Sequence, residues 1–314
     1  MTPDTPPPAP TRLSVVICTH NRPDALRQCI AALMAAPEEP GCEFIVVDSA
    51  SNTETRRAME DMLAPFPRIV LHRLDQPGLS RARNTGMALS SGEWIAFLDD
   101  DTVPAPDWLA RACTLIAEVP PACSIIGGAV HPLHPAGMPA LPSRWLQLLS
   151  IIEEKGEGDR THAPAVCGAN IILRKSHLLE VGGFPERLGR QGLRLLSGEE
   201  KFVERRLITL GARLWYSDRL RVQHMIAPDR LQWRWIATRA YWEGISDVII
   251  LRLMGTRPGV LKALKVACGA VILGPLSVLP FSGSDTALRF WYDVGWLREF
   301  IGGREAGARE EPAG

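Results

Sequence analysis

Short apolar runs alternate with amphipathic stretches of ten to fifteen residues from Leu13 to about His131. Runs rich in β-branched residues favour strands, and apolar residues that recur every three or four positions favour helices. Strands that alternate with helices predict an α/β fold, in which a mostly parallel sheet carries helices on both faces. The expected strands span 13–18, 43–48, 68–74 and 94–99, and the expected helices span 23–35, 53–63 and 79–90.

Polar residues follow three of the four expected strands. The carboxyl ends of parallel strands meet at one edge of a sheet, and ligands of open α/β proteins bind outside that edge. We therefore expect the three strand exits to line one common crevice. These exits are residues 19–22, 48–52 and 99–102.

Three consecutive acids, Asp99, Asp100 and Asp101, end the fourth expected strand. Like charges at one strand end repel unless a cation lies among them. In an extended segment, side chains alternate, which places Asp99 and Asp101 on one side and leaves Asp100 facing away. Two carboxylates on one side can bind a divalent metal ion that also binds substrate phosphates. A solvated acidic turn is the alternative.

The pattern from about residue 133 to residue 218 is less regular. It predicts a strand at 169–174, a helix at 199–210, and two short strands at 214–216 and 221–224. Ser197 to Glu200 has the S-x-x-E form of a helix-capping box, which is a purely structural role for Glu200.

The sequence changes character after about residue 228. Residues 229–244 place two tryptophans and an arginine on one face of an expected helix. Residues 266–281 carry no charge, but they are interrupted by proline and fall short of the roughly 20 residues that a membrane-spanning helix needs. Lys262 and Lys265 precede them, which favours a helix at a membrane surface. An apolar helix packed on the rest of the protein is the alternative.

Charge and cysteine content exclude several classes of protein. Lysine plus arginine and aspartate plus glutamate each number 35, so no overall charge attracts nucleic acid. The seven cysteines never form a CxxC pair, which favours free thiols in a reducing cytoplasm over disulfides or a zinc site. Residues 1–11 are rich in proline and have neither a basic start nor an apolar stretch, so we expect a disordered tail and no export signal.

Six motifs occur in a fixed order along most of the chain: "LSVVICTHNRP", "FIVVDSAS", "ARNTGMALSSGEWIAFLDDDTVP", "GGF", "GEEKFVERRLITLGARLWY" and "VQH". As a set they resemble the family 2 glycosyltransferases over residues 13 to about 224. The resemblance implies the GT-A fold. It implies a nucleotide-sugar-binding half at 12–131 and an acceptor half at 132–226, followed by a helical region at 227–314 for which membrane association is one expectation.

The resemblance implies roles for residues of the strand exits. Thr19 and Asp48 match positions that contact the nucleotide base, and Arg83 matches a position near the diphosphate. Ser49 stands where many members carry a second acid, so the nucleotide stays open. With the other polar residues of the exits, the expected donor-binding residues are Thr19, Asn21, Arg22, Asp48, Arg83, Asp99 and Asp100.

The resemblance also implies a metal site and a catalytic base. Asp99 and Asp101 match the two ends of the family's DxD motif, and His224 matches a late histidine that approaches the metal or diphosphate in some relatives. The expected cofactor is Mg²⁺ or Mn²⁺. Glu200 falls on the position of the base, where the family usually has Asp after Glu, so Glu199 stays open as the alternative. A satisfied core histidine is the alternative for His224.

The implied reaction is an inverting transfer from a nucleotide-diphosphate sugar to a hydroxyl of a glycan or glycolipid. The metal would neutralise the leaving diphosphate, and Glu200 would take the acceptor's proton. We expect this reaction in surface polysaccharide or glycolipid assembly, in the cytoplasm or at the inner face of the cell membrane. Two alternatives are a noncatalytic nucleotide-sugar-binding module tethered at a membrane and a sugar-phosphate nucleotidyltransferase. The latter should have a glycine- and arginine-rich loop directly after the first strand, where this chain has "CTHNRPD".

Overall fold

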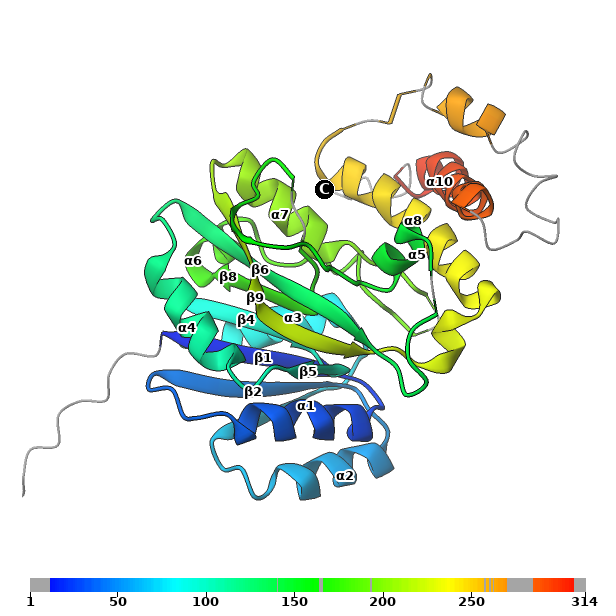
Figure 1. Cartoon of the computed structure of the whole chain (residues 1–314). Helices are drawn as coiled ribbons and strands as arrows, with labels where there is room; N and C mark the ends of the chain where they lie inside the picture. The colour runs from blue at the N-terminus through cyan, green and yellow to red at the C-terminus, as the bar shows by residue number, and fades with distance from the viewer. Residues whose placement is uncertain are drawn as a thin grey trace, which may run out of the picture.

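A computed structural model of the chain shows a twisted sheet covered by helices, with a pair of long helices at one end (Figure 1). The expected tail at 1–11, Lys262 and most of the uncharged stretch at 266–281 lie outside the described residues. The described residues are 12–139, 141–163, 166–192, 194–256, 258–259, 261, 263–269 and 285–307.

The described residues form one nine-stranded mixed sheet with the order β3-β2-β1-β4-β8-β6-β9-β5, and β7 pairs with β9 off this path. The first four strands of this order are parallel to one another, whereas β8 runs antiparallel to both β4 and β6. The strands are β1 (Leu13–Thr19), β2 (Cys42–Ser49), β3 (Ile69–Leu74), β4 (Trp94–Asp99), β5 (Thr102–Pro104), β6 (Cys123–Leu133), β7 (Glu157–Asp159), β8 (Asn170–Arg174) and β9 (Arg213–Met225).

Helices cover both faces of the sheet because successive strand residues point to opposite sides. In β1, Val15 and Ile17 belong to a core that α1, α2 and α4 cover, while Val16 belongs to a second core under α3, α6 and α7. The helices of these two layers are α1 (Pro23–Ala35), α2 (Thr53–Leu63), α3 (Leu79–Leu89), α4 (Trp108–Glu118), α6 (Lys175–Glu180) and α7 (Glu199–Thr209).

The predicted elements of the first half agree closely with the structure. The expected helices at 23–35 and 53–63 coincide with α1 and α2, and the four expected strands differ from β1 to β4 by one residue or less at most ends. The two short strands expected at 214–216 and 221–224 are wrong as separate elements. They are one strand, β9, because β6 pairs along its whole length with a register shift between Gly128 and Ala129.

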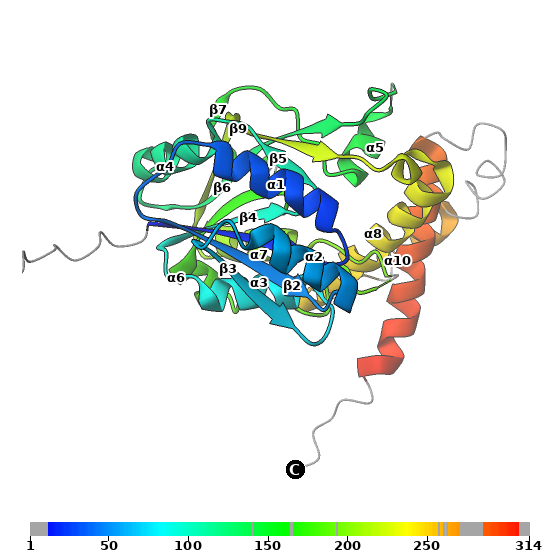
Figure 2. The same cartoon turned by 90° about the horizontal axis from the view of Figure 1, so that it is seen from below.

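A helical region follows β9. It begins with the 3₁₀ helix η1 (Pro228–Leu231) and α8 (Trp233–Leu253) and ends with α10 (Asp285–Gly307), which packs along α8 (Figures 1 and 2). Residues 261 and 263–269 are helical and contribute Ala263 and Val266 to a small core with Trp296. None of the helices described here is both long enough and apolar enough to cross a bilayer.

Candidate active site

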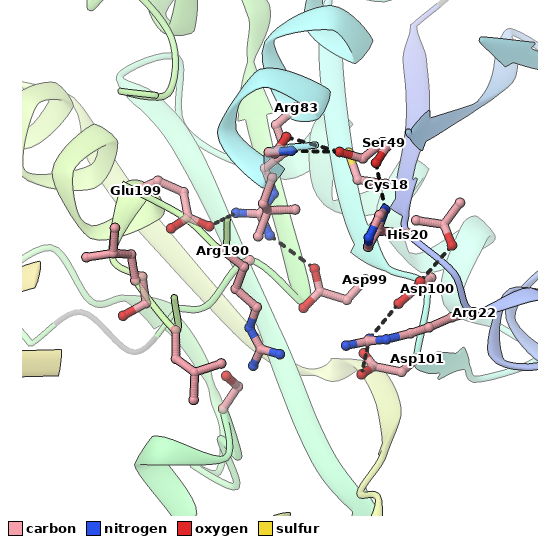
Figure 3. A pocket seen from close by; sticks show the side chains of 18 of the residues that line it. Cys18, His20, Arg22, Ser49, Arg83, Asp99, Asp100, Asp101, Arg190 and Glu199 are labelled. Carbon is pink, nitrogen blue, oxygen red and sulfur yellow. Dashed lines mark hydrogen bonds and ion pairs between the residues drawn. The ribbon is translucent and has the colours of Figure 1, made fainter. Parts of the chain in front are cut away.

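The carboxyl ends of β1, β2 and β4 open into one cavity of about 240 Å³ (Figure 3). Strand register brings them together, because Thr19 lies opposite Asp48, and Cys18 lies opposite Asp99. The expectation that the three strand exits line one crevice is therefore confirmed. The polar lining consists mainly of Thr19, His20, Arg22, Ser49, Arg83, Asp99, Asp100, Asp101, Arg190, Glu199, Glu200, His224, Arg230 and Arg239.

Asp100 does not face away from its two neighbours, so that expectation is wrong. Strand β4 ends at Asp99 and the chain turns, and side-chain alternation holds only within an extended segment. Asp100 Oδ2 accepts a hydrogen bond of 2.7 Å from Thr19 Oγ1, and its Oδ1 lies 3.0 Å from Arg22 Nη1. Burial raises the pKa of Asp100 to about 6, against the opposing charge of Arg22.

Asp101 is buried at the centre of a charged cluster. Its Oδ2 lies 2.9 Å from Arg22 Nη1 and 3.0 Å from Arg230 Nη2, and its Oδ1 lies 3.3 Å from His224 Nε2. Burial alone would raise the pKa of Asp101, but His224 and the two arginines hold it well below its ordinary value. Strand pairing explains the position of His224, because β5 and β9 place Thr102 opposite it.

Both ring nitrogens of His224 have polar neighbours. Its Nδ1 lies 3.0 Å from the carbonyl oxygen of Leu149, which can only accept, so Nδ1 carries the proton. In the neutral ring Nε2 then presents a lone pair that accepts from Arg230 Nη1 at 3.3 Å, and Nε2 also lies 3.3 Å from Asp101 Oδ1. A carboxylate oxygen and an imidazole nitrogen are both ligands of divalent metals, so these donors fit the expected ion. Within the described ranges, no cluster of three or more His, Cys, Asp or Glu residues is arranged to hold a metal ion.

Arg83 joins the end of β4 to the start of α7. It is 3% exposed, and its Nη1 lies 2.6 Å from Glu199 Oε1 while its Nη2 lies 3.1 Å from Asp99 Oδ1. Gly168 allows this arrangement, because a Cβ there would lie 2.1 Å from Arg83 Nη2. Burial alone would lower the pKa of Arg83, but Glu199 and Asp99 raise it. The bridge fixes Asp99 at the cavity wall.

Glu199 and Glu200 begin α7 and have different surroundings. Glu199 is buried in its ion pair with Arg83, and burial together with the charge of Glu200 raises its pKa to about 7. Glu200 lines the cavity and makes no hydrogen bond or ion pair with the described residues. The capping-box role is wrong, because Gly198 precedes the helix without a side-chain cap. The hydroxyl of Ser197 instead donates to Glu243 Oε2 at 2.9 Å.

Two of the expected donor-binding residues, Asp48 and Asn21, lie beside the cavity lining. Asn21 has a positive φ of 54°, and its Oδ1 accepts a hydrogen bond from the backbone of Asn52. Asp48 is buried, and its Oδ1 accepts from Ser51 N at 2.9 Å. Its Oδ2 is buried without a hydrogen-bond partner in the described part of the chain. Among the described residues, Asp48 Oδ2 therefore has no donor and is available to accept a hydrogen bond from a ligand.

Three arginines of the cavity were not expected from the sequence. Arg230 comes from η1 and Arg239 from α8, where Arg239 Nη1 lies 2.7 Å from Glu243 Oε2. Helical spacing predicts that Arg239 lies on one face of a helix, but nothing in the sequence relates that face to the acids. Arg190 lies on a loop with no motif except its neighbouring glycines.

A second cavity of about 930 Å³ adjoins the first between α5 (Ser143–Leu148), α7, α8 and α10. Glu200, Ser197 and Arg239 line both cavities. The second cavity has both polar and apolar walls. The polar side includes Lys201 and Glu243, and the apolar side includes Leu146, Ile151, Val266, Leu288 and Trp296.

Comparisons with known proteins identify the family of the chain. Residues 14–182 match the family model of glycosyl transferase family 2. The glucosyl-dolichyl phosphate glucuronosyltransferase of Haloferax volcanii is 30% identical over 244 residues, 76% of this chain and 77% of that protein. The pre-mycofactocin glycosyltransferase of Mycobacterium tuberculosis is 28% identical over 273 residues, 85% of this chain but only 53% of that protein, so the chain spans about half its length.

Structural similarity points to the same fold. A mannosyltransferase of Pyrobaculum calidifontis, solved with GDP-mannose and Mn²⁺, superposes with a TM-score of 0.59 over 93% of this chain and 89% of that one, at 17% identity. The expected GT-A fold is thereby confirmed. The family match covers more than half of the chain, so this protein belongs to glycosyltransferase family 2 and is a glycosyltransferase.

Proposed function

We propose that the protein transfers a sugar from a nucleotide-diphosphate sugar to a hydroxyl of a glycan or glycolipid, with inversion at the anomeric carbon. One observation carries this proposal: a single cavity joins the carboxylates of Asp99 and Asp101 to Glu200. Arginines on one wall, beside acids that could hold a cation, suit the diphosphate, and the carboxylate of Glu200, which has no partner among the described residues, suits a base.

The strand exits would hold the donor. Asp48 Oδ2 is a buried acceptor without a hydrogen-bond partner in the described ranges, which supports a bond from the nucleotide base or ribose. Thr19 would contact the nucleotide next to Asp48. Asn21 would hold the loop that surrounds these two residues. Arg22 and Arg83 bring guanidinium groups to the acids, and Asp100 orients Arg22.

Mg²⁺ or Mn²⁺ would be held by Asp101 and His224, with Asp99 on the same rim. Such an ion, when bound, supplies charge neutralisation for the leaving diphosphate. Support comes from the donor set, in which Asp101 Oδ1 and His224 Nε2 lie 3.3 Å apart. The mannosyltransferase of P. calidifontis was solved with Mn²⁺ beside GDP-mannose.

Glu200 would act as the base. It would take the proton of the acceptor hydroxyl as that oxygen attacks the anomeric carbon from the side opposite the diphosphate. The bond between the anomeric carbon and the diphosphate oxygen then breaks, and the centre is inverted in one displacement. Glu199 is less suited to this role, because Arg83 holds its carboxylate in a buried ion pair.

The second cavity would receive the acceptor. Its polar and apolar walls suit an amphipathic molecule, with a sugar at Glu200 and an apolar chain beside Leu288 and Trp296. The H. volcanii relative is named after a lipid-linked sugar, glucosyl-dolichyl phosphate. A glycolipid acceptor would bring the helical region to a membrane surface. Leu261 and Leu264 are exposed there, by 77% and 57%.

Replacement of the base tests the proposal. The Glu200→Gln variant should lose about 10²- to 10⁴-fold in turnover, because the amide cannot accept the proton. Release of UDP or GDP from a panel of nucleotide sugars, with octyl glycosides as acceptors and Mn²⁺ present, is the measurement. Glu180→Gln, an exposed glutamate at the end of α6, is the matched control and should keep wild-type turnover.

Donor binding should survive in the Glu200→Gln variant, seen as an unchanged rise of melting temperature with nucleotide sugar and Mn²⁺. Wild-type turnover in this variant would contradict the role of Glu200. A wild-type protein that no nucleotide sugar stabilises would contradict the proposed donor.

A further inference from the structure

We propose that Arg190 binds an oxyanion of the donor, and that this contact is a major determinant of donor affinity. The oxyanion is either an oxygen of the diphosphate or the carboxylate of an acidic sugar, two groups that share the chemistry a guanidinium recognises. The inference rests on the proposed function, because it takes a nucleotide-diphosphate sugar as the ligand of this cavity.

The backbone around Arg190 is fixed against the first turn of α3. Its carbonyl oxygen accepts a hydrogen bond of 3.2 Å from Leu79 N, and the hydroxyl of Ser80 donates to the carbonyl oxygen of Leu188 at 2.8 Å. Gly189 has a φ of +78°, and a Cβ there would lie 2.7 Å from Ser80 Oγ. The loop is therefore held tightly at residues 188–190.

The side chain of Arg190 projects into the cavity, between the side that carries Glu199 and the side that carries Asp101 (Figure 3). Its position comes from the backbone contacts and not from an ion pair. The side chain of Arg190 makes no hydrogen bond or ion pair with any residue in the described ranges, although it lines a cavity that contains five carboxylates.

Every other arginine of the cavity has a carboxylate partner. Among the arginines of the described lining, Arg190 is therefore the one without a carboxylate partner. The pairs are Arg22 with Asp100 and Asp101, Arg83 with Asp99 and Glu199, Arg230 with Asp101, and Arg239 with Glu243.

The surroundings of Arg190 favour an anion. Burial, together with the charges of Arg230, Arg239 and Arg22, lowers its pKa to about 10 against the opposite effect of Asp101. The group is still protonated at pH 7, so its positive charge lies in a confined place where other arginines repel it. An oxyanion placed there would gain a forked hydrogen bond and remove this repulsion. The donor brings such an oxyanion next to the acids and Glu200.

Binding of defined probes to charge variants tests the inference. Isothermal titration with UDP, UDP-glucose and UDP-glucuronate, with GDP and GDP-mannose in parallel and Mn²⁺ present, measures Kd for each protein. Arg190→Gln should raise Kd by about 10- to 100-fold, which is the effect of losing a charge-assisted bond. Arg190→Lys should lose less, because it keeps the charge without the fork.

Arg187→Gln is the matched control, because Arg187 lies on the same loop, is exposed, and makes no ion pair with the described residues. Its Kd values should stay within about twofold of wild type. The ligand-free melting temperature of Arg190→Gln should not fall, because the substitution removes a charge that has no partner in the described part of the chain.

The outcomes separate the two sources of the oxyanion. Equal weakening for UDP, UDP-glucose and UDP-glucuronate assigns Arg190 to the diphosphate, and weakening for UDP-glucuronate alone assigns it to a sugar carboxylate. Kd values within twofold of wild type for every probe would overturn the role of Arg190. Failure of the wild-type protein to bind any probe would instead contradict the proposed function.

Discussion

Three glutamates of α7 show how strongly surroundings decide the state of one residue type. Glu199 is buried and paired with Arg83, Glu200 faces the cavity without a partner in the described chain, and Glu204 is 7% exposed without a hydrogen bond or ion pair there. Burial, and then the charge of Glu200, raises the pKa of Glu204 to about 7. Glu204 thus keeps its proton to a higher pH in the folded protein than an ordinary glutamate does.

The raised pKa of Glu204 predicts a pH-dependent stability. The folded pKa of about 7 lies above the ordinary value of 4.5, so its contribution is fully present below pH 4.5 and is lost as the pH rises through about 7. Glu204→Gln removes this loss. Relative to wild type, the variant should gain about 2 kcal/mol in unfolding free energy between pH 5 and pH 8. Urea denaturation at both pH values measures it.

Titrating groups that do not interact with Glu204 are common to both proteins and cancel in this difference. A constant offset between Glu204→Gln and wild type at pH 5 and pH 8 would report only the cost or gain of the buried amide. Such a constant offset would show that the pKa of Glu204 is not raised in the folded state.

At the scale of single residues, the sequence indicated the acids of the cavity but not all of its cations. Asp99, Asp101 and Thr19 follow strands whose apolar pattern is clear, so their common edge could be predicted. The orientation of Asp100 could not, because it depends on where β4 ends. Arg190 and Arg230 reach the cavity from a loop and a 3₁₀ helix far along the chain, and no local pattern relates them to the acids.

Elements with local end signals were predictable, and elements set by distant contacts were not. Pro23 begins α1, and the side chain of Asn52 caps α2 by accepting from Thr55 N at 2.8 Å. The start of α7 also has a local signal, but Glu243 takes the hydroxyl of Ser197 from 46 positions away. Long-range pairing with β6 likewise makes β9 one strand.

The contact between α8 and α10 depends on two glycines. A Cβ on Gly244 would lie 2.1 Å from the carbonyl oxygen of Tyr292, and a Cβ on Gly295 would lie 1.9 Å from that of Tyr241. Gly244→Ala or Gly295→Ala should therefore separate the helices and cost about 2 kcal/mol of unfolding free energy. Thermal and urea denaturation measure the loss.

Gly302 provides the control on the same helix, because a Cβ there meets nothing within 4 Å among the described atoms. Gly302→Ala should leave stability unchanged or raise it by up to about 1 kcal/mol, since alanine is the better helix former. Equal effects of all three substitutions would mean that the helices do not approach as closely as these distances indicate.

At the scale of the whole molecule, the helical region completes the site and does not stand apart from it. Arg230 of η1 contacts Asp101, and Arg239 and Glu243 of α8 line the second cavity, beside Glu200. The same region exposes the apolar side chains of Leu261 and Leu264, which lie in the helical residues 261 and 263–269. One region therefore contributes to the cavity proposed for the acceptor and to the surface proposed to meet a membrane.

The exposed pair Leu261 and Leu264 predicts binding to lipid vesicles. The two residues are three apart on one helix face, next to the exposed Lys265, while Ala263 and Val266 on the other face pack against Trp296. Burying two leucines in lipid contributes about 1 kcal/mol or more for each, and Lys265 adds attraction to anionic lipid. The double variant Leu261→Gln and Leu264→Gln should weaken binding about tenfold or more in cosedimentation with vesicles of phosphatidylcholine and phosphatidylglycerol.

Leu210→Gln is the matched control, because Leu210 is 53% exposed at the end of α7, outside the helical region, and its loss should leave vesicle binding unchanged. Neutral vesicles and high salt separate the two contributions, since salt weakens the attraction of Lys265 but not the burial of leucine. Equal cosedimentation of wild type and the double variant would place the membrane contact elsewhere. If the wild-type protein stays in the supernatant, the proposed membrane contact is contradicted. The acceptor would then have to reach the proposed acceptor cavity from solution.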